Sequence, residues 1–121
     1  MRRQVLVGVA VSVALVLGVG LVVWAGTQGW EGPHGKAKRL LGQAQRAAHQ
    51  GHLPEAQVDL EELIGAFPES PVADDALLIL GQVYEQQQLL LESRMTLRVL
   101  LERFPSSPVV GQAQEELGRV N

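Results

Sequence analysis

The sequence contains no cysteine, few aromatic residues and, after its first thirty residues, few basic ones. Without cysteine the chain has no disulfide, no thiolate metal ligand and no cysteine nucleophile. Aromatic residues make up 4% of the chain, too few to predict a platform for stacking bases or sugars. From residue 31 onward eight Lys/Arg stand against thirteen Asp/Glu, whereas nucleic-acid binding needs a basic surface. These shortages exclude a disulfide-stapled fold and disfavour nucleic-acid partners.

The residue types that usually carry catalysis or hold metals form no convergent set. His49 and His52 are the only close histidine pair, and no carboxylate or thiol is expected beside them, whereas a metal site needs three or four ligands. Adjacent acidic residues, which point about 100° apart on a helix, occur at Glu61-Glu62, Asp74-Asp75 and Glu115-Glu116. No strand is visible for a phosphate-binding loop to follow. The sequence therefore predicts a protein with no enzymatic activity, metal or cofactor.

One long apolar run lies at the N-terminus. Residues 5–25, VLVGVAVSVALVLGVGLVVWA, contain no charge, and about 20 apolar residues in a helix cross a bilayer core of roughly 30 Å. Arg2 and Arg3 precede the run, and Trp24 lies near its end, where interfacial aromatic residues are common. We predict a transmembrane signal-anchor helix over residues 1–25. A cleaved secretory signal is the main alternative, although its apolar core normally has about 7–15 residues, and a twin-arginine export signal is a weaker one.

The charges on either side of this run predict its orientation. Arg2 and Arg3 precede it, whereas Lys36, Lys38 and Arg39 lie well beyond Trp24 on a predicted helix and should count for less. We therefore expect the N-terminus inside the cytoplasmic (inner) membrane. The rest of this single-pass chain would then lie on the periplasmic or extracytoplasmic side.

Small residues recur every four positions within the apolar run, at Ala10, Ala14 and Gly18. On a helix they share one face, which would let a second transmembrane helix approach closely. A run rich in Val, Gly and Ala also gives this spacing by chance. Both interpretations of the face stay open.

The composition changes after the apolar run. Residues 26–35, GTQGWEGPHG, contain four glycines and a proline, which predicts a flexible linker rather than a helix or strand. The sequence thus divides into an anchor over 1–25, a linker over 26–35 and a domain over 36–121.

The domain contains an internal repeat with an offset of 37 residues, in which FPESPV at 67–72 returns as FPSSPV at 104–109. A repeat period in the thirties is typical of helical solenoids. Pro68 and Pro105 are expected to end helices, because the residue before a proline is pushed out of the helical region. Ser70 and Ser107 are expected to cap the next helices, with a proline at each first helical position.

Between these motifs the apolar residues recur at helical spacing. We expect Gly81 where two helices cross closely and Tyr84 between neighbouring repeat units. The fold class is therefore all-α, with about two helix pairs and a capping helix. Because solenoids usually need at least three repeats to bury a continuous core, self-association or partner binding is expected as well. The shared faces are Leu77, Leu80, Gly81 and Tyr84, then Leu97, Leu100, Leu101 and Phe104, then Val109, Ala113, Leu117 and Val120.

This pattern resembles the tetratricopeptide repeat. The second unit supplies its signature residues more completely than the first, where Gln43 and Ala47 replace the expected Leu and Tyr. The FPxSP linker is similar to that of bacterial envelope members, such as the Tol-Pal-associated coordinator and BamD-type proteins. The residues of the second unit that carry the resemblance are Leu77, Leu80, Gly81, Tyr84, Ser93, Leu97, Leu100 and Pro105.

The resemblance implies a concave groove, lined by the first helix of each pair, that binds a protein or peptide partner. Leu41 and Leu78 would form its apolar floor, or else pack against each other and leave the groove idle. The function expected is a membrane-tethered adaptor or scaffold; the alternative is an accessory subunit packed permanently into a larger membrane complex. The groove residues implied are Lys38, Leu41, Gln45, His49, Asp75, Leu78, Gln82, Glu85, Gln86, Gln112, Glu115 and Arg119.

Overall fold

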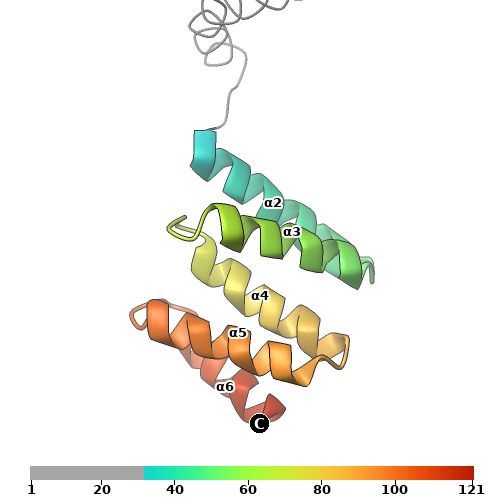
Figure 1. Ribbon diagram of the computed structural model, residues 1–121, viewed down its shortest axis with the longest axis vertical. Coiled ribbons are helices and arrows are strands. Elements are labelled where there is room, and N and C mark those ends of the chain that lie inside the picture. The colour runs from blue at the N-terminus through green and yellow to red at the C-terminus, as the bar shows by residue number, and fades with distance from the viewer. Residues whose placement is uncertain (1–31) are drawn as a thin grey trace, which may run out of the picture. The chain divides into compact units, whose positions relative to one another are not determined.

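The computed structural model describes residues 32–121, which form five α-helices and no strand (Figure 1). The predicted anchor over 1–25, its face at Ala10, Ala14 and Gly18, and most of the predicted linker lie outside the described residues. In the described part the all-α prediction is confirmed. The helices are α2 (Gly32–His49), α3 (Leu53–Ala66), α4 (Ala73–Gln86), α5 (Leu90–Arg103) and α6 (Val110–Val120).

The first described helix begins earlier than the sequence predicted. α2 starts at Gly32, so the last four positions of the predicted linker are helical. Pro33 does not prevent this, because a proline in the first turn of a helix lacks only an N–H that would have no helical partner there. Within residues 32–121 no helix combines the length and the apolar character that crossing a bilayer requires.

Consecutive helices run antiparallel and stack into a short solenoid (Figure 1). α2 pairs with α3, α4 pairs with α5, and α6 packs against the far side of α4 and α5. The first helices of successive pairs, α2 and α4, and the final α6 therefore lie in one layer. α3 and α5 form the other layer.

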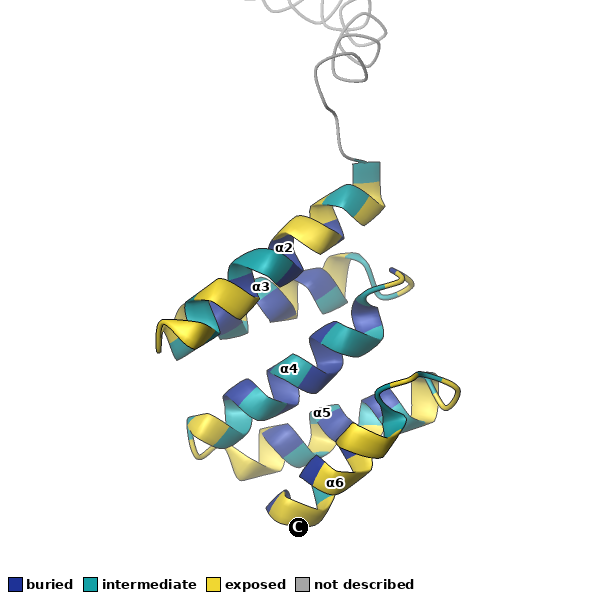
Figure 2. Ribbon diagram, turned by 180° about the vertical axis from the view of Figure 1, so that it is seen from behind, coloured by how far each residue is buried: buried dark blue, intermediate teal, exposed yellow. Residues whose placement is uncertain are grey.

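The core consists of two apolar clusters, and α4 contributes to both. Figure 2 shows buried residues along most of α4, whereas α2 and α6 carry wide exposed stripes. The first cluster joins α2, α3 and α4, and the second joins α4, α5 and α6. Their buried members are Ala37, Leu40, Leu41, Ala44, Ala56, Leu60, Leu63, Ala76, Leu80 and Val83 in the first, and Leu77, Leu78, Leu97, Leu100, Ala113 and Val120 in the second.

The FPxSP segments form turns, and the helices after them start later than predicted. The carbonyl of Ser70 accepts a hydrogen bond from Ala73 N (3.0 Å), which closes a turn with Pro71 at its second position. The Ser70 hydroxyl accepts from Val72 N at 3.3 Å. α4 then begins at Ala73 with no side-chain cap. The serine therefore caps the turn and not the helix, and Ser107 does the same before α6, accepting from Val109 N at 3.2 Å.

The close helix crossing predicted at Gly81 is confirmed. A Cβ atom at Gly81 would lie 2.7 Å from Leu97 Cδ2 on α5, and the Ser93 hydroxyl donates to the Gly81 carbonyl at 2.7 Å. The expected position of Tyr84 between units is also confirmed, because its hydroxyl donates to Glu61 on α3 at 2.6 Å. Through these contacts α4 packs against both α3 and α5.

Candidate functional site

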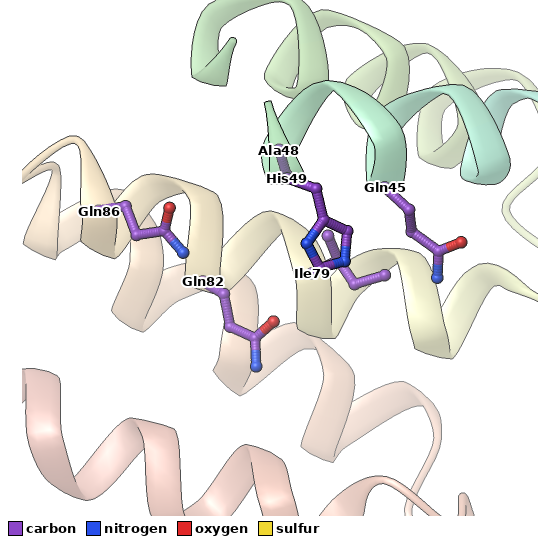
Figure 3. Close-up of a pocket in the computed structure, with 6 residues that line it drawn as sticks. All are labelled: Gln45, Ala48, His49, Ile79, Gln82 and Gln86. Atoms are coloured by element: carbon purple, nitrogen blue, oxygen red, sulfur yellow. The ribbon is translucent and has the colours of Figure 1, made fainter. Parts of the chain in front are cut away.

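A hollow of about 280 Å³ lies between α2 and α4 on the layer of first helices (Figure 3). α2 contributes Gln45, Ala48 and His49, whose i, i+3, i+4 spacing puts them on one helix face. α4 contributes Ile79, Gln82 and Gln86, which share a face for the same reason. We call this space the amide hollow, because three of its six lining side chains are glutamines.

Most polar side chains that line the amide hollow make no hydrogen bond within the part of the chain that the structure describes. Within residues 32–121, the side chains of Gln45, His49 and Gln86 have no hydrogen-bond partner, and all three are exposed. Ile79 is half-buried and packs on the first core cluster, so it gives the hollow an apolar floor. The hollow therefore combines free amides with a small apolar surface, and none of its lining residues is Lys, Arg, Asp or Glu.

Two other glutamines, Gln57 on α3 and Gln87 directly after α4, hold the fold together. Gln87 donates from Nε2 to Gln57 Oε1 at 2.9 Å, and Gln57 donates to Glu61 Oε1 at 2.8 Å. This chain of amides joins α3 to the end of α4, away from the amide hollow. Gln86, the immediate neighbour of Gln87, takes no part in it.

A second hollow, of about 440 Å³, adjoins the first between α4 and α6. Gln82 and Gln86 line both hollows, so the two form a continuous face over α2, α4 and α6. We call this second space the ionic hollow. Its further lining residues are Glu85, Gln88, Glu116 and Arg119.

A buried carboxylate organises the ionic hollow. Glu116 is 6% exposed; its Oε1 accepts from Gln82 Nε2 at 3.2 Å, and its Oε2 pairs with the Arg119 guanidinium. Arg119 also lies 3.7 Å from Glu85 Oε1 and 3.9 Å from Glu115 Oε1. Three carboxylates thus share one guanidinium on this part of the face.

The pKa values of Glu85 and Glu116 shift in opposite directions from their ordinary value. Burial raises the pKa of Glu85, and the adjacent Glu116 raises it further, by more than Arg119 lowers it. Burial alone would also raise the pKa of Glu116. Hydrogen bonds with Arg119, Gln82 and Glu85 outweigh burial and bring the pKa of Glu116 below its ordinary value.

Six of the twelve predicted groove residues line this face. Gln45, His49, Gln82 and Gln86 line the amide hollow, and Glu85 and Arg119 line the ionic hollow. Lys38 is exposed on α2 and Asp75 is half-buried on α4, but neither lines a hollow. Gln112 and Glu115 are exposed on α6 and line neither hollow.

Leu41 and Leu78 do not form the predicted apolar floor of the groove, because both are buried in the core. Leu41 is 9% exposed and belongs to the first core cluster, whereas Leu78 is 6% exposed and belongs to the second. The two leucines therefore fill separate parts of the core. The floor is provided one position further along α4, by Ile79, because α4 turns Leu78 toward α5 and α6.

Four residues that line the two hollows were not predicted from the sequence. Ile79 stands in the apolar run Leu77-Leu78-Ile79-Leu80, where periodicity does not tell which residue faces outward. Its spacing of three to Gln82 was the available signal. Ala48 and Gln88 carried no signal, and Glu116 stood in a pair of adjacent acidic residues from which the sequence predicted no function. Within residues 32–121 no group of three or more His, Asp or Glu is arranged to hold a metal ion.

A family model described as tetratricopeptide repeat matches residues 75–107, which span α4, α5 and the start of the following turn. The chain therefore contains a tetratricopeptide repeat in its second helix pair, as its sequence predicted. Such repeats typically bind protein partners and generally act as scaffolds rather than catalysts. No curated protein matches the chain.

Proposed function

We propose that this chain is a protein-interaction adaptor that binds a polypeptide segment of its partner on the face formed by α2, α4 and α6. The observation that carries the proposal is the amide hollow: exposed, unpaired amides lie beside an apolar floor on a helix that is packed firmly on its other sides. Unpaired amides bind a partner at little cost in free energy, since they have no internal hydrogen bonds to break. The tetratricopeptide repeat over residues 75–107 supports a role in binding proteins.

Site-specific photocrosslinking tests this function in the organism that makes the protein. A photoreactive benzoylphenylalanine replaces His49, which is exposed in the amide hollow, or Gln114, which is exposed on α6 and lines neither hollow. We expect a defined protein adduct from position 49 only, and its loss when Gln45→Arg and Gln86→Arg fill the hollow. Equal adducts from both positions, or none from position 49, would contradict the proposal.

We further propose that the adaptor is tethered to the cytoplasmic membrane by its N-terminal segment, with the helical domain outside and a relation to the bacterial envelope type. The support is in the sequence: residues 5–25 are uncharged, Arg2 and Arg3 precede them, and the FPxSP linker occurs twice. Extraction by detergent but not by alkaline carbonate is expected. Protease added to intact spheroplasts should remove an epitope placed after Asn121, and protection of that epitope would refute the orientation.

An exposed apolar band favours a second candidate, an accessory subunit of a membrane complex. Leu90, Leu91 and Met95 on α5 are 43%, 55% and 59% exposed, and Met95 also lines an apolar hollow of about 390 Å³ between α3 and α5. A permanent neighbour, or a second copy in a homo-oligomer, would cover such a band. Size measurement after mild detergent extraction separates these cases, because a subunit copurifies with other chains in fixed ratio.

A further inference from the structure

The outer face of the layer formed by α3 and α5 carries an exposed apolar residue at the same position of both repeat units. Val58 on α3 is 61% exposed and Met95 on α5 is 59% exposed, and the repeat offset of 37 residues separates them. Pro54 and Leu91, about one helical turn earlier and also 37 residues apart, are exposed as well. An apolar stripe therefore crosses both helices, and within residues 32–121 nothing covers it.

The charges beside this stripe differ in sign between the two helices. Every charged residue of α3 is acidic, namely Glu55, Asp59, Glu61 and Glu62. α5 has three arginines against two glutamates; Arg94 and Arg98 lie near its middle, and Glu92 and Glu102 lie nearer its ends. In the part of the chain that the structure describes, Arg94 and Arg98 have no ion pair. An acidic helix thus lies beside one with unpaired positive charge at its centre.

Most of these charges lie on sides of the two helices that point away from each other. Ile64 on α3 and Thr96 and Val99 on α5 help to line the hollow of about 390 Å³ between the helices. The two central arginines of α5, and the acidic residues of α3 other than Glu61, lie outside this hollow. We call these sides the acidic flank of α3 and the basic flank of α5. The acidic flank consists of Glu55, Asp59 and Glu62, and the basic flank consists of Arg94 and Arg98.

A face with an apolar centre, an acidic flank on one side and a basic flank on the other is complementary to itself. Rotation by 180° about an axis that runs along the helices, midway between α3 and α5, places α3 of one copy opposite α5 of a second copy. Each acidic flank then meets a basic flank. A two-fold axis across the helices would instead place α3 opposite α3, and the carboxylates would repel each other.

The same charges argue against a lipid surface as the cover of this face. Anionic lipids attract arginines near a membrane, but they would repel the acidic flank and Glu61. A second copy supplies both the complementary flanks and an apolar stripe of the same length. The observations therefore favour a second copy of this chain.

We propose that the outer face of α3 and α5 is the interface of a two-fold homodimer, in which Val58 of one copy packs on Met95 of the other and Glu62 pairs with Arg98. α3 and α5 run in the same direction, each has 14 residues, and the repeat offset separates their first residues (Figure 1). Positions 37 apart therefore lie at the same height and face each other across the axis. The interface leaves the face over α2, α4 and α6 free, so this inference goes beyond the proposed function and does not depend on it.

Disulfide cross-linking in the intact chain tests the arrangement, since the natural sequence has no cysteine to interfere. Val58→Cys and Met95→Cys are made in separate chains with different epitope tags, coexpressed, purified in mild detergent and oxidised with copper phenanthroline. We expect a cross-linked dimer that carries both tags. Each variant alone should cross-link no more than Gln114→Cys, which is exposed on α6 and measures chance collision, because the axis keeps identical positions apart.

Charge reversal tests the pairing between the flanks. Glu62→Arg and Arg98→Glu should each raise the Kd of the dimer about tenfold, because every change acts twice across a two-fold axis. The double variant Glu62→Arg/Arg98→Glu exchanges the two charges and should restore the Kd. Arg46→Glu, exposed on α2 in the other layer, should leave it unchanged. Light scattering in detergent gives the Kd, and circular dichroism confirms that each variant is folded.

Each other outcome would overturn the proposed dimer. Cross-linking of Val58→Cys to itself would indicate an axis across the helices, and yields no higher than that of Gln114→Cys would show that the two faces do not meet. A Kd unchanged by both single charge reversals, or a different chain copurifying in fixed ratio in place of the second copy, would refute it as well. The adduct expected from position 49 depends on none of these results, so the proposed function stands or fails separately.

Discussion

The two helix pairs of the solenoid share one repeat but cross in different ways. In the second pair Gly81 lets α4 approach α5 so closely that a Cβ would meet Leu97, and Ser93 bonds the Gly81 carbonyl across the crossing. The equivalent positions of the first pair, 37 residues earlier, are Ala44 and Ala56. Both alanines are fully buried, but they permit neither that approach nor the hydrogen bond.

The family model matches residues 75–107 in the second pair. The first pair departs from the signature of the repeat at Gln43 and Ala47, which stand where the second pair has Leu80 and Tyr84. The first pair reaches the same antiparallel arrangement with apolar volume alone, from residues such as Leu40, Leu60 and Leu63. A fold of this kind therefore tolerates loss of the signature in one unit if the buried volume is kept.

The pairs also differ in how far they are covered. Half of the fourteen residues of α4 are buried, against four of the eighteen in α2. Within residues 32–121, α4 is packed by α3, α5 and α6, whereas α2 is the outermost helix. The second pair should therefore carry more of the stability, and four experiments on the intact chain in mild detergent examine that difference.

The largest effect is expected from a charge placed in the core at equivalent leucines. Leu78→Glu puts a carboxylate among α4, α5 and α6, where desolvation costs several kcal/mol, so the domain should lose its cooperative thermal transition in circular dichroism. Leu41→Glu should cost less, because a side chain on the outermost helix can turn its carboxylate toward water. An unchanged melting point for Leu78→Glu would mean that this leucine is on the surface after all.

Adding one methyl group to the crossing should have the next largest effect. Gly81→Ala gains about 1 kcal/mol of helix propensity, but its Cβ would lie 2.7 Å from Leu97 Cδ2, so Leu97, which is fully buried, would have to move. Overpacking of this kind costs about 1–3 kcal/mol, so we expect a net loss of stability in thermal melting. Ala44→Gly in the first pair should lose the propensity difference and the burial of one methyl group, and a stabilised Gly81→Ala would show that Leu97 can move aside at the crossing.

Removing the hydroxyl at the crossing should cost about 1 kcal/mol, the net contribution of one hydrogen bond. Ser93→Ala leaves the Gly81 carbonyl without the bond at 2.7 Å, and a lower melting point is expected. The reverse change in the first pair, Ala56→Ser, buries a hydroxyl and should destabilise too. If Ala56→Ser raised the melting point instead, the two crossings would be more alike than their geometry indicates.

The fold was largely predictable from sequence because its signals are local. The repeat, the prolines and the helical spacing predicted the order of the helices, and Gly81 and Tyr84 lie where their residue types require. The start of α2 was missed because glycines outweighed the fact that Pro33 is harmless in a first turn. The starts of α4 and α6 were predicted too early, at Pro71 and Pro108 instead of Ala73 and Val110, since one serine hydroxyl can cap a turn or a helix equally well.

The face over α2, α4 and α6 that we propose as the binding site was predictable only in part. Its glutamines were found because exposed polar residues recur at helical spacing, but the choice between Leu78 and Ile79 depends on where α5 and α6 pack. The role of Glu116 depends on contacts between helices that are distant in sequence, to Gln82 and Glu85. Sequence spacing within one helix contains no information about either.

The smallest effect is expected from the charge that only the second pair carries on this face. The folded-state pKa of Glu85 is raised above its ordinary value of 4.5, so its contribution to stability is present below pH 4.5 and is lost as the pH rises through the folded-state pKa. The pKa of Glu116 is lowered, so its contribution is lost only as the pH falls below 4.5.

Between pH 4.5 and 7 the two carboxyl groups can therefore be separated by replacing Glu85 alone. Glu85→Gln resembles the protonated carboxyl at every pH, so its melting point should exceed that of the unmodified chain at pH 7 and converge with it as the pH falls toward 4.5. The equivalent residue of the first pair is Ala48, and within residues 32–121 no Asp or Glu lines the hollow to which it belongs. Ala48→Glu and Ala48→Gln should accordingly differ by an amount that does not depend on pH over this range. If the melting points of Glu85→Gln and the unmodified chain instead differ by the same amount at every pH between 4.5 and 7, Arg119 fully offsets the repulsion from Glu116. The two pairs would then not differ in charge coupling.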